Sequence, residues 1–405
     1  MATTETPAAQ ARPGRPSTRG RRGRPSRFLL IVVVVLALLF GVPWAVLVYP
    51  LPHWPTPVTV AGTIVTVLAL AAFPPMMILG HGRGRDWAAR IGDTILGVIW
   101  IVFAWTVLSF VLRLGLTVAG VADPARSRIV AIAVAIVALG LIGWGNREAM
   151  RVPRVRRVDV TLPRLGQDLD GTTVAVLTDT HYGPINRAAW SARVVEVVNL
   201  LDADVVCHVG DIADGTPEQR AEQSAPLGDV RATLARIYVT GNHEYFSEGQ
   251  GWLDRMASLG WEPMHNRHVV VSRGGDRLVL AGIDDITARH SGRPGHGADI
   301  DAALAGVSPD LPVLLLAHQP KQIGDAIRAG VDLQISGHTH GGQIWPFHML
   351  VRTDQPVLHG LSRHGDRTQL YTSRGAGFWG PPFRVFAPSE ITLLTLRSLA
   401  PTPAP

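Results

Sequence analysis

The sequence has a single cysteine and few charged residues for a chain of 405. Cys207 can form no disulfide within the chain, and it lies in an apolar stretch, which is typical of a small buried core residue. Charged residues make up 17% of the chain and the formal net charge is +6. An abundance of apolar residues beside so little charge indicates that the chain combines a membrane part with a globular part.

Four uncharged apolar runs fill most of the first third of the chain. Each is close to the ~20 residues that a helix needs to cross a bilayer core, although the fourth is short and must borrow neighbouring residues. Pro74 and Pro75 are expected to kink or end the second helix. The runs contain no Asp, Glu, Lys or His, which argues against an ion or proton pathway. The predicted spans are Phe28 to Val48, Val58 to Leu79, Thr94 to Leu112 and Ile129 to Trp144.

Arginines outside these runs predict the orientation and the domain boundaries. The basic tail and the segment after the fourth span are the richest in Arg, so both are expected in the cytoplasm, with the globular half on the same side. Arg113, Arg126 and Arg128 between the third and fourth spans argue the other way, and an odd number of spans would place the globular half outside. The tail is interpreted as a membrane anchor and not as a nucleic-acid arm. We predict a disordered basic tail at 1–26, a four-helix transmembrane region at 27–146, a basic juxtamembrane linker at 147–157, a globular domain at 158–397 and a disordered tail at 398–405.

The globular half alternates short β-branched runs with amphipathic segments. Thr173 to Leu177 and Ala203 to Val209 read as buried strands, and Ala188 to Leu201 reads as a helix between them. Pro226 to Ala235 is predicted as a further helix, and Val158 to Leu162 as an edge strand. The pattern predicts an α/β domain of two stacked mixed sheets flanked by helices, after an all-α transmembrane bundle of four helices.

Polar side chains follow four of the predicted strands, at the points where the strands end. In open α/β sheets this edge is where ligands bind. Carboxylate, amide and imidazole groups suit divalent Mn, Fe, Zn or Co, and the sequence offers no thiolate cluster for a softer site. Seven ligands are too many for one ion, whereas a bridging Asp211 would allow two ions about 4 Å apart. The candidate ligands are Asp179, His181, Asp211, Asn242, His318, His338 and His340.

These residues form a pattern that resembles a known family. Asp179-x-His181, Gly210-Asp211-x-x-Asp214, Gly241-Asn242-His243-Glu244, His318 and Gly337-His338-x-His340 are similar to the five-part signature of the calcineurin-like metallophosphoesterases. The continuation through Gln343 and the run Tyr371-x-Ser373-Arg374-Gly375 resemble the bacterial membrane-associated phosphodiesterase branch.

The resemblance implies a role for each residue. One metal would be held by Asp179, His181, Asp211 and His340, and the other by Asp211, Asn242, His318 and His338. A hydroxide bridging the two ions would attack phosphorus in line. His243 would give a proton to the leaving oxygen, and Asp214 would orient His243.

The sequence leaves other polar and apolar features open. Asp284-Asp285 either faces the site or caps the next segment. The apolar insertion Gln343 to Gly360 is either a buried flap or a loop that contacts the bilayer, in which case Trp345 and Phe347 would touch the apolar part of a lipid substrate. Arg374, with Arg363 and Arg367, is a candidate for binding a second phosphate, although basic loop residues are more often only solvated.

Two functions from different classes follow from the sequence. The first is a membrane-anchored phosphohydrolase that cleaves a phosphodiester or pyrophosphate. The more specific form of this hypothesis is that the substrate is linked to a lipid. The second is a membrane receptor or scaffold that binds phospho-ligands without turnover. No residue of the signature is missing, which favours the enzyme. No nucleic acid is expected as a partner.

Overall fold

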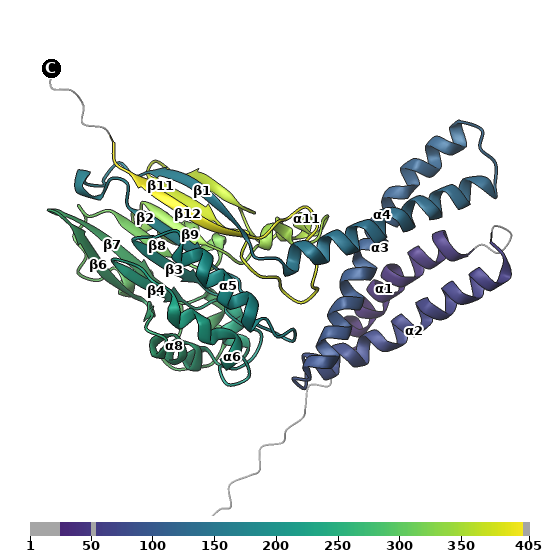
Figure 1. Ribbon diagram of the computed structural model, residues 1–405, viewed down its shortest axis with the longest axis horizontal. Coiled ribbons are helices and arrows are strands. Elements are labelled where there is room, and N and C mark those ends of the chain that lie inside the picture. Colours follow the sequence, from purple (N-terminus) through teal and green to yellow (C-terminus); the bar gives the residue numbers. More distant parts are fainter. Residues whose placement is uncertain (1–24, 50–53, 400–405) are drawn as a thin grey trace, which may run out of the picture.

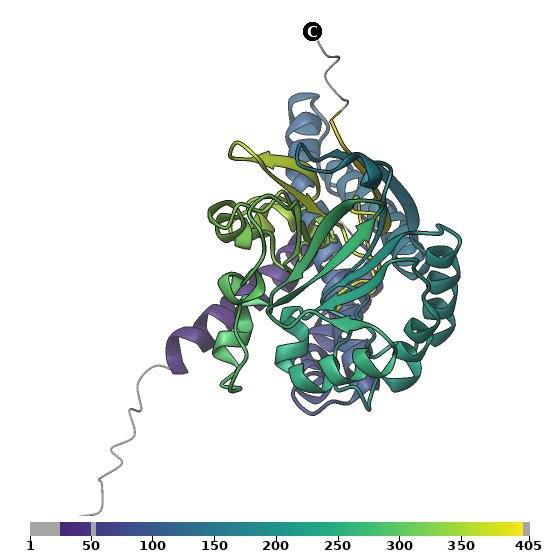
Figure 2. The same cartoon turned by 90° about the vertical axis from the view of Figure 1, so that its left-hand side faces the viewer.

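The computed structural model describes residues 25–49 and 54–399, and it has two parts (Figure 1). Most of the predicted tails 1–26 and 398–405 lies outside this range. Four helices long and apolar enough to cross a membrane form a bundle, in agreement with the sequence prediction. Figure 2 looks onto the α/β domain with the bundle behind it. The helices are α1 (Pro25–Pro43, extended by a π-helical turn at Trp44–Val48), α2 (Thr56–Gly80), α3 (Asp86–Val118) and α4 (Ala125–Met150).

The helices extend beyond the apolar runs that predicted them. α2 continues through Pro74 and Pro75 to Gly80, so the helix does not end at the proline pair. α3 has 33 residues. At 1.5 Å per residue it is about 50 Å long, about 20 Å more than a hydrocarbon core of roughly 30 Å. α4 has 26 residues, which removes the concern that the fourth span is too short.

The α/β domain consists of two stacked six-stranded mixed sheets, as predicted. The first sheet has the order β1-β12-β2-β3-β4-β5, in which only the β12–β2 pair is antiparallel. The second has the order β10-β11-β9-β8-β7-β6, with antiparallel pairs at both of its edges. The strands are β1 (Arg154–Thr161), β2 (Thr173–Leu177), β3 (Val205–Val209), β4 (Ala235–Val239), β5 (Glu262–Pro263), β6 (Arg267–Arg273), β7 (Asp276–Gly282), β8 (Val313–Leu316), β9 (Leu333–Ser336), β10 (Gly360–His364), β11 (Thr368–Thr372) and β12 (Glu390–Arg397).

Alternation along each strand divides the apolar residues between separate cores. Val174 and Val176 of β2 face the second sheet, whereas Ala175 and Leu177 face α5. Because successive side chains of a strand point to opposite faces, both faces of this sheet are buried. The helices of the domain are α5 (Ala188–Asn199), α6 (Ala221–Ser224), α7 (Asn242–Phe246), α8 (Gly249–Ser258), α9 (Ile300–Ala303), α10 (Ile323–Arg328) and α11 (His348–Val351).

Two local predictions differ from the structure. Residues 226–235 were expected to be helical, but only a short 3-10 segment, Ala225–Asp229, forms before β4 begins at Ala235. The predicted linker at 147–157 is reduced to 151–153, because α4 continues to Met150 and β1 begins at Arg154. Arg154 of β1 pairs with Glu148 of α4. This arginine is therefore held by the protein and is not part of a free basic linker.

The bundle and the α/β domain are packed together and not joined by a loose tether. Asn146 Nδ2 donates to Pro382 O at 3.0 Å, and Arg384 N donates to Gly145 O at 2.9 Å. A small apolar cluster joins α3 and α4 to the segment 381–386 and to the insertion after Gln343. These bonds hold α4 against the domain, and Trp100 Nε1 of α3, which donates to Ile344 O at 3.2 Å, holds α3 there as well.

Candidate metal centre

The candidate ligands meet where the strands of both sheets end. Asp179 and His181 follow β2, Asp211 follows β3, and His338 and His340 follow β9. All five have positive φ angles, between 42° and 69°. Residues other than glycine rarely adopt this conformation, and such strain gathers at functional sites. The backbone is thus bent to turn these side chains toward one point.

One group of ligand atoms gathers around His181. Its Nε2 lies 3.1 Å from His340 Nε2, 3.6 Å from Asp211 Oδ2 and 4.0 Å from Asp179 Oδ1. His340 Nε2 lies 3.5 Å from Asp179 Oδ1. Asp179, His181 and His340 are near enough to hold one metal ion.

A second group shares Asp211 with the first. His318 Nε2 lies 3.1 Å from Asp211 Oδ2, and His338 completes a set of three candidate ligands. Within the described residues, His318 Nε2 and Asn242 Oδ1 are buried without a hydrogen-bond partner. Orphaned buried acceptors are costly unless something binds them. His318 Nε2 therefore fits a cation beside Asp211, and Asn242 Oδ1, at the start of α7, is a further acceptor without a partner.

Hydrogen bonds fix the orientation of two of the imidazoles. His318 Nδ1 donates to Val209 O at 2.6 Å, and His181 Nδ1 donates to Asp214 Oδ1 at 3.2 Å. Each bond leaves the Nε2 lone pair facing the other ligands, as metal-binding histidines require. The residues present consequently fit divalent metal ions.

His243 and Asp214 form a pair at the edge of this centre. His243 Nδ1 lies 2.6 Å from Asp214 Oδ1, and His243 N donates to Asp211 Oδ1 at 2.9 Å. Burial alone would lower the pKa of His243, but Asp211 and Asp214 outweigh it and raise the pKa to about 9. Burial opposes ionisation of Asp214, yet His181 and His243 lower its pKa. The two carboxylates thus favour the protonated form of the imidazole next to the candidate metal ligands.

Glu244 belongs to one of the sequence motifs, but no role was predicted for it. Its buried carboxylate accepts hydrogen bonds from the backbone N–H groups of Gly241 at 2.6 Å, Asp211 at 2.9 Å and Ile212 at 2.7 Å. These bonds join the ends of β3 and β4. Glu244 therefore holds the turn that carries Asp211. Its position next to Asn242 and His243 in the sequence could have indicated that it has a role at the site.

Two buried arginines were also missed. Arg384 is fully buried and donates to the carbonyls of Gly377 at 2.8 Å and His340 at 3.3 Å. Arg187 donates to the carbonyl of His181 at 3.2 Å. Both support the loops that carry candidate ligands, and no residue pattern in the sequence sets them apart from other arginines.

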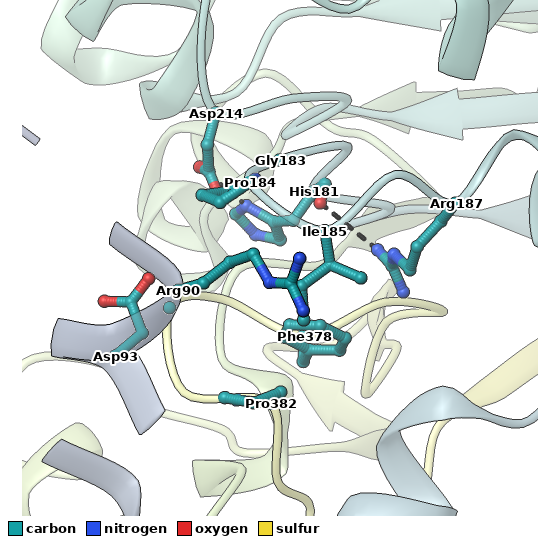
Figure 3. Close-up of a pocket in the computed structure, with 11 residues that line it drawn as sticks. Arg90, Asp93, His181, Gly183, Pro184, Ile185, Arg187, Asp214, Phe378 and Pro382 are labelled. Carbon is teal, nitrogen blue, oxygen red and sulfur yellow. Dashed lines mark hydrogen bonds and ion pairs between the residues drawn. The ribbon is translucent and has the colours of Figure 1, made fainter. Parts of the chain in front are cut away.

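A transmembrane helix contributes to the pocket next to His181 (Figure 3). Arg90 and Asp93 come from α3, whereas the rest of the lining comes from the α/β domain. Figure 3 shows the Arg90 side chain extending from the helix toward Ile185 and Phe378. The other lining residues are His181, Gly183, Pro184, Arg187, Asp214, Gly380 and Pro382.

The predicted substrate contacts lie elsewhere. Trp345 lies against Trp105 of α3 with ring centroids 5.9 Å apart and the rings tilted by 43°, and Phe347 meets Trp100 edge-on at 5.8 Å. Neither residue lines the pocket beside His181. Trp345 and Phe347 therefore pack against α3, whereas Met349 and Leu350 of the same insertion are exposed.

Arg374 and the Asp284-Asp285 pair are held by other protein groups. Arg374 Nη1 lies 3.4 Å from Glu390 Oε2, so the arginine is already paired. Asp285 accepts from Thr287 N at 2.8 Å and caps the next segment, as one of the two readings expected. Asp284 accepts from His265 Nδ1 at 2.7 Å, and with His296 it forms a separate candidate metal cluster.

Comparisons with known proteins agree with this geometry. The family model described as calcineurin-like phosphoesterase matches residues 172–342. An uncharacterized metallophosphoesterase of Helicobacter pylori is 38% identical over 262 residues, covering 64% of this chain and 68% of the relative. Proteins described as transmembrane protein with metallophosphoesterase domain are 37% identical in Danio rerio (65% of this chain, 61% of the relative) and 37% identical in Bos taurus (64% and 60%). The chain thus spans less than two thirds of these animal relatives. The family prediction is confirmed, and the chain belongs to the calcineurin-like metallophosphoesterases.

Proposed function

We propose that this protein is a membrane-anchored, metal-dependent phosphohydrolase that cleaves a lipid-linked phosphodiester or pyrophosphate. The observation that carries the proposal is the meeting of two buried ligand groups at Asp211, whose Oδ2 lies 3.1 Å from His318 Nε2 and 3.6 Å from His181 Nε2. Asp179, His181, Asp211 and His340 would hold one ion of the Mn, Fe, Zn or Co type. Asp211, Asn242, His318 and His338 would hold the other. When bound, such ions activate a water molecule and neutralise charge on the phosphoryl oxygens.

His243 is placed to supply the proton that the leaving group needs. Its Nδ1 is bonded to Asp214, which leaves Nε2 to act on the substrate. The water oxygen bonds to phosphorus and gives up one proton to solvent, the phosphorus–oxygen bond to the leaving group breaks, and the leaving oxygen takes the proton from His243 Nε2. Asp214 keeps the imidazole oriented throughout, because it accepts from both His181 and His243.

The residues that line the pocket support a substrate that comes from the membrane. Arg90 and Asp93 of α3 line the pocket that also contains His181. A site built in part from a membrane-spanning helix is open to lipid head groups at the bilayer surface. We place the α/β domain in the cytoplasm, on the basis of the arginine distribution.

Two substitutions test the assignment on the purified full-length protein. Asp211→Asn is expected to lower metal content and abolish hydrolysis together, because both ions share this carboxylate. His243→Ala is expected to keep the metal and to slow turnover by about 10²–10⁴ on substrates with poor leaving groups. The exposed His290 provides the control, and His290→Gln is expected to change neither quantity.

Metal content is measured by elemental analysis, and hydrolysis is measured on an aryl phosphodiester, an aryl phosphomonoester and a nucleotide-linked lipid in vesicles. Full metal content and full rate in Asp211→Asn would contradict the shared-ligand assignment. A metal-loaded wild-type protein that hydrolyses none of the substrates would instead support the receptor or scaffold function.

A further inference from the structure

The pocket beside His181 contains a buried arginine that is in direct contact with no carboxylate of the described residues. Arg187 is 3% exposed, and it forms no ion pair with any described residue. Its Nη1 has no hydrogen-bond partner within the same part of the chain. A guanidinium is not deprotonated in proteins, so Arg187 keeps its charge although it is buried. Buried charges are normally paired, so this one indicates a missing anion.

Aromatic rings hold this guanidinium in place. Its central carbon lies 4.2 Å from the ring centroid of Trp190 and 4.5 Å from that of Phe378. Nη2 donates to the carbonyls of Thr180 and His181. Arg187 is therefore fixed directly behind a candidate metal ligand, and an anion bound to it would lie next to the metal centre.

Arg90 adds a second positive charge to the same pocket from the membrane side. Its guanidinium is exposed, and among the described residues it has no hydrogen bond or ion pair. The acidic neighbours in the lining are already engaged, since Asp93 is bonded to His81 Nε2 at 2.9 Å and Asp214 to two histidines. Two arginines thus face a space in which no carboxylate is free to pair with them.

We propose that Arg90 and Arg187 form an anion subsite for a second phosphate group of the substrate, directly beside the phosphorus that is attacked. The substrate class is then a lipid-borne diphosphate ester. Arginine suits this role because its planar fork binds two phosphate oxygens at once. This inference rests on the proposed function and narrows it. In the reaction, water oxygen bonds to one phosphorus, the bond to the bridging oxygen breaks, and the departing phosphate takes one proton.

The depth of Arg90 in the bilayer argues for a lipid as the carrier. Arg90 lies near the start of α3, a helix of 33 residues. Because the helix is about 20 Å longer than a hydrocarbon core, its first turns extend to the level of the head groups. A lipid diphosphate would present its phosphates at the level of the head groups, where Arg90 lies. A soluble ester would not bind better because Arg90 lies at this level.

Equilibrium binding separates the subsite from the metal centre. Methylenediphosphonate and methylphosphonate are titrated into the metal-loaded full chain, in wild type, Arg90→Gln and Arg83→Gln. Both probes contact the metals, so only the ratio of their dissociation constants reports on the second phosphate. Losing one charge-assisted contact is expected to reduce the preference for the diphosphonate about tenfold in Arg90→Gln. Arg83 is exposed and does not line the pocket, so Arg83→Gln is expected to keep the wild-type ratio.

Kinetics provide the second measurement. The KM for a diacylglycerol diphosphate in phosphatidylcholine vesicles is expected to rise in Arg90→Gln by several-fold more than the KM for an aryl phosphodiester, with Arg90→Lys partly restoring it. The wild type is expected to prefer the vesicle-borne ester over soluble methyl diphosphate. An unchanged ratio of dissociation constants, or equal effects on both esters, would overturn the subsite and leave the phosphohydrolase standing. A wild type inactive on every ester would overturn the proposed function itself.

Discussion

Arg220 of the α/β domain and Asp86 at the first position of α3 form a two-pronged ion pair. Arg220 Nη1 lies 2.6 Å from Asp86 Oδ2, and Nη2 lies 2.7 Å from Oδ1. Arg220 Nε also donates to the backbone carbonyl of Asp214 at 2.8 Å. One buried side chain therefore links the start of a membrane helix to the segment that orients His243.

We predict that this pair couples the bundle to the α/β domain by about 1 kcal/mol, because Asp86 is half exposed and solvent weakens the attraction. Arg220→Gln, Asp86→Asn and the double variant form a thermodynamic cycle, read from the thermal unfolding of the full chain. Lys321 and Asp354, an exposed pair within the domain, provide the matched control and are expected to couple less. Additive effects of the Arg220 and Asp86 substitutions would contradict the prediction.

Glu244→Gln is expected to destabilise the α/β domain by about 2 kcal/mol and to lower its unfolding temperature by about 4–8 °C. The amide keeps the shape of the carboxylate. Its NH₂ group is a donor, however, so it would face a backbone N–H group that needs an acceptor. Since the carboxylate also holds the turn at Asp211, metal content is expected to fall as well. Glu248→Gln, an exposed glutamate nearby, is the control. A stable variant with full metal content would show that the three hydrogen bonds are replaceable.

The sequence predicted which side chains meet at the strand ends better than it predicted their surroundings. Asp179 and Asp211 follow short β-branched strands, and strand ends of parallel sheets meet at one edge, so local patterns sufficed to place them. Residues 226–235 were misassigned because helix propensity is a weak guide where tertiary contacts decide. The roles of Arg90 and Arg187 could not be predicted, since they depend on the packing of α3 against a domain far along the chain.

The basic linker illustrates the same limit. Arg154, Arg156 and Arg157 were predicted as part of a basic juxtamembrane linker, but they lie in β1, which pairs in parallel with β12. Arg156 lies 3.7 Å from Glu390 of that partner strand. A strand whose partner lies more than 200 residues away leaves no local signal that distinguishes it from a linker.

Reporter fusions after residue 157, on a chain truncated there, are expected to report a cytoplasmic position. α3 begins and α4 ends at the side of the bundle that contacts the α/β domain, and an even number of spans returns the chain to the side on which it began. The arginine distribution assigns that side to the cytoplasm. Fusions in the loop at 119–124 are expected to give the opposite signal. A reversed pattern at both positions would place the α/β domain outside.

Gly97→Val is expected to reduce hydrolysis roughly tenfold or more, although Gly97 lies in a membrane-spanning helix and touches none of the candidate ligands. A Cβ atom at Gly97 would lie 2.4 Å from Phe383 Cδ2, so the segment that contains Phe383 must shift. The next residue, Arg384, bonds the carbonyls of Gly377 and His340, and its movement would disturb a candidate metal ligand.

Gly115 in the same helix provides the matched control. Among the described residues, no atom of another element lies within 4 Å of the place that a Cβ on Gly115 would take, so Gly115→Val changes the helix equally without pressing on the domain. Both variants are compared in metal content, in KM and kcat on an aryl phosphodiester, and in thermal unfolding. A loss confined to Gly97→Val would mean that the packing of α3 against residues 381–385 holds His340 in place. Equal losses in the two variants would point to the bundle alone, and an active Gly97→Val would show that Phe383 moves aside without transmitting the strain.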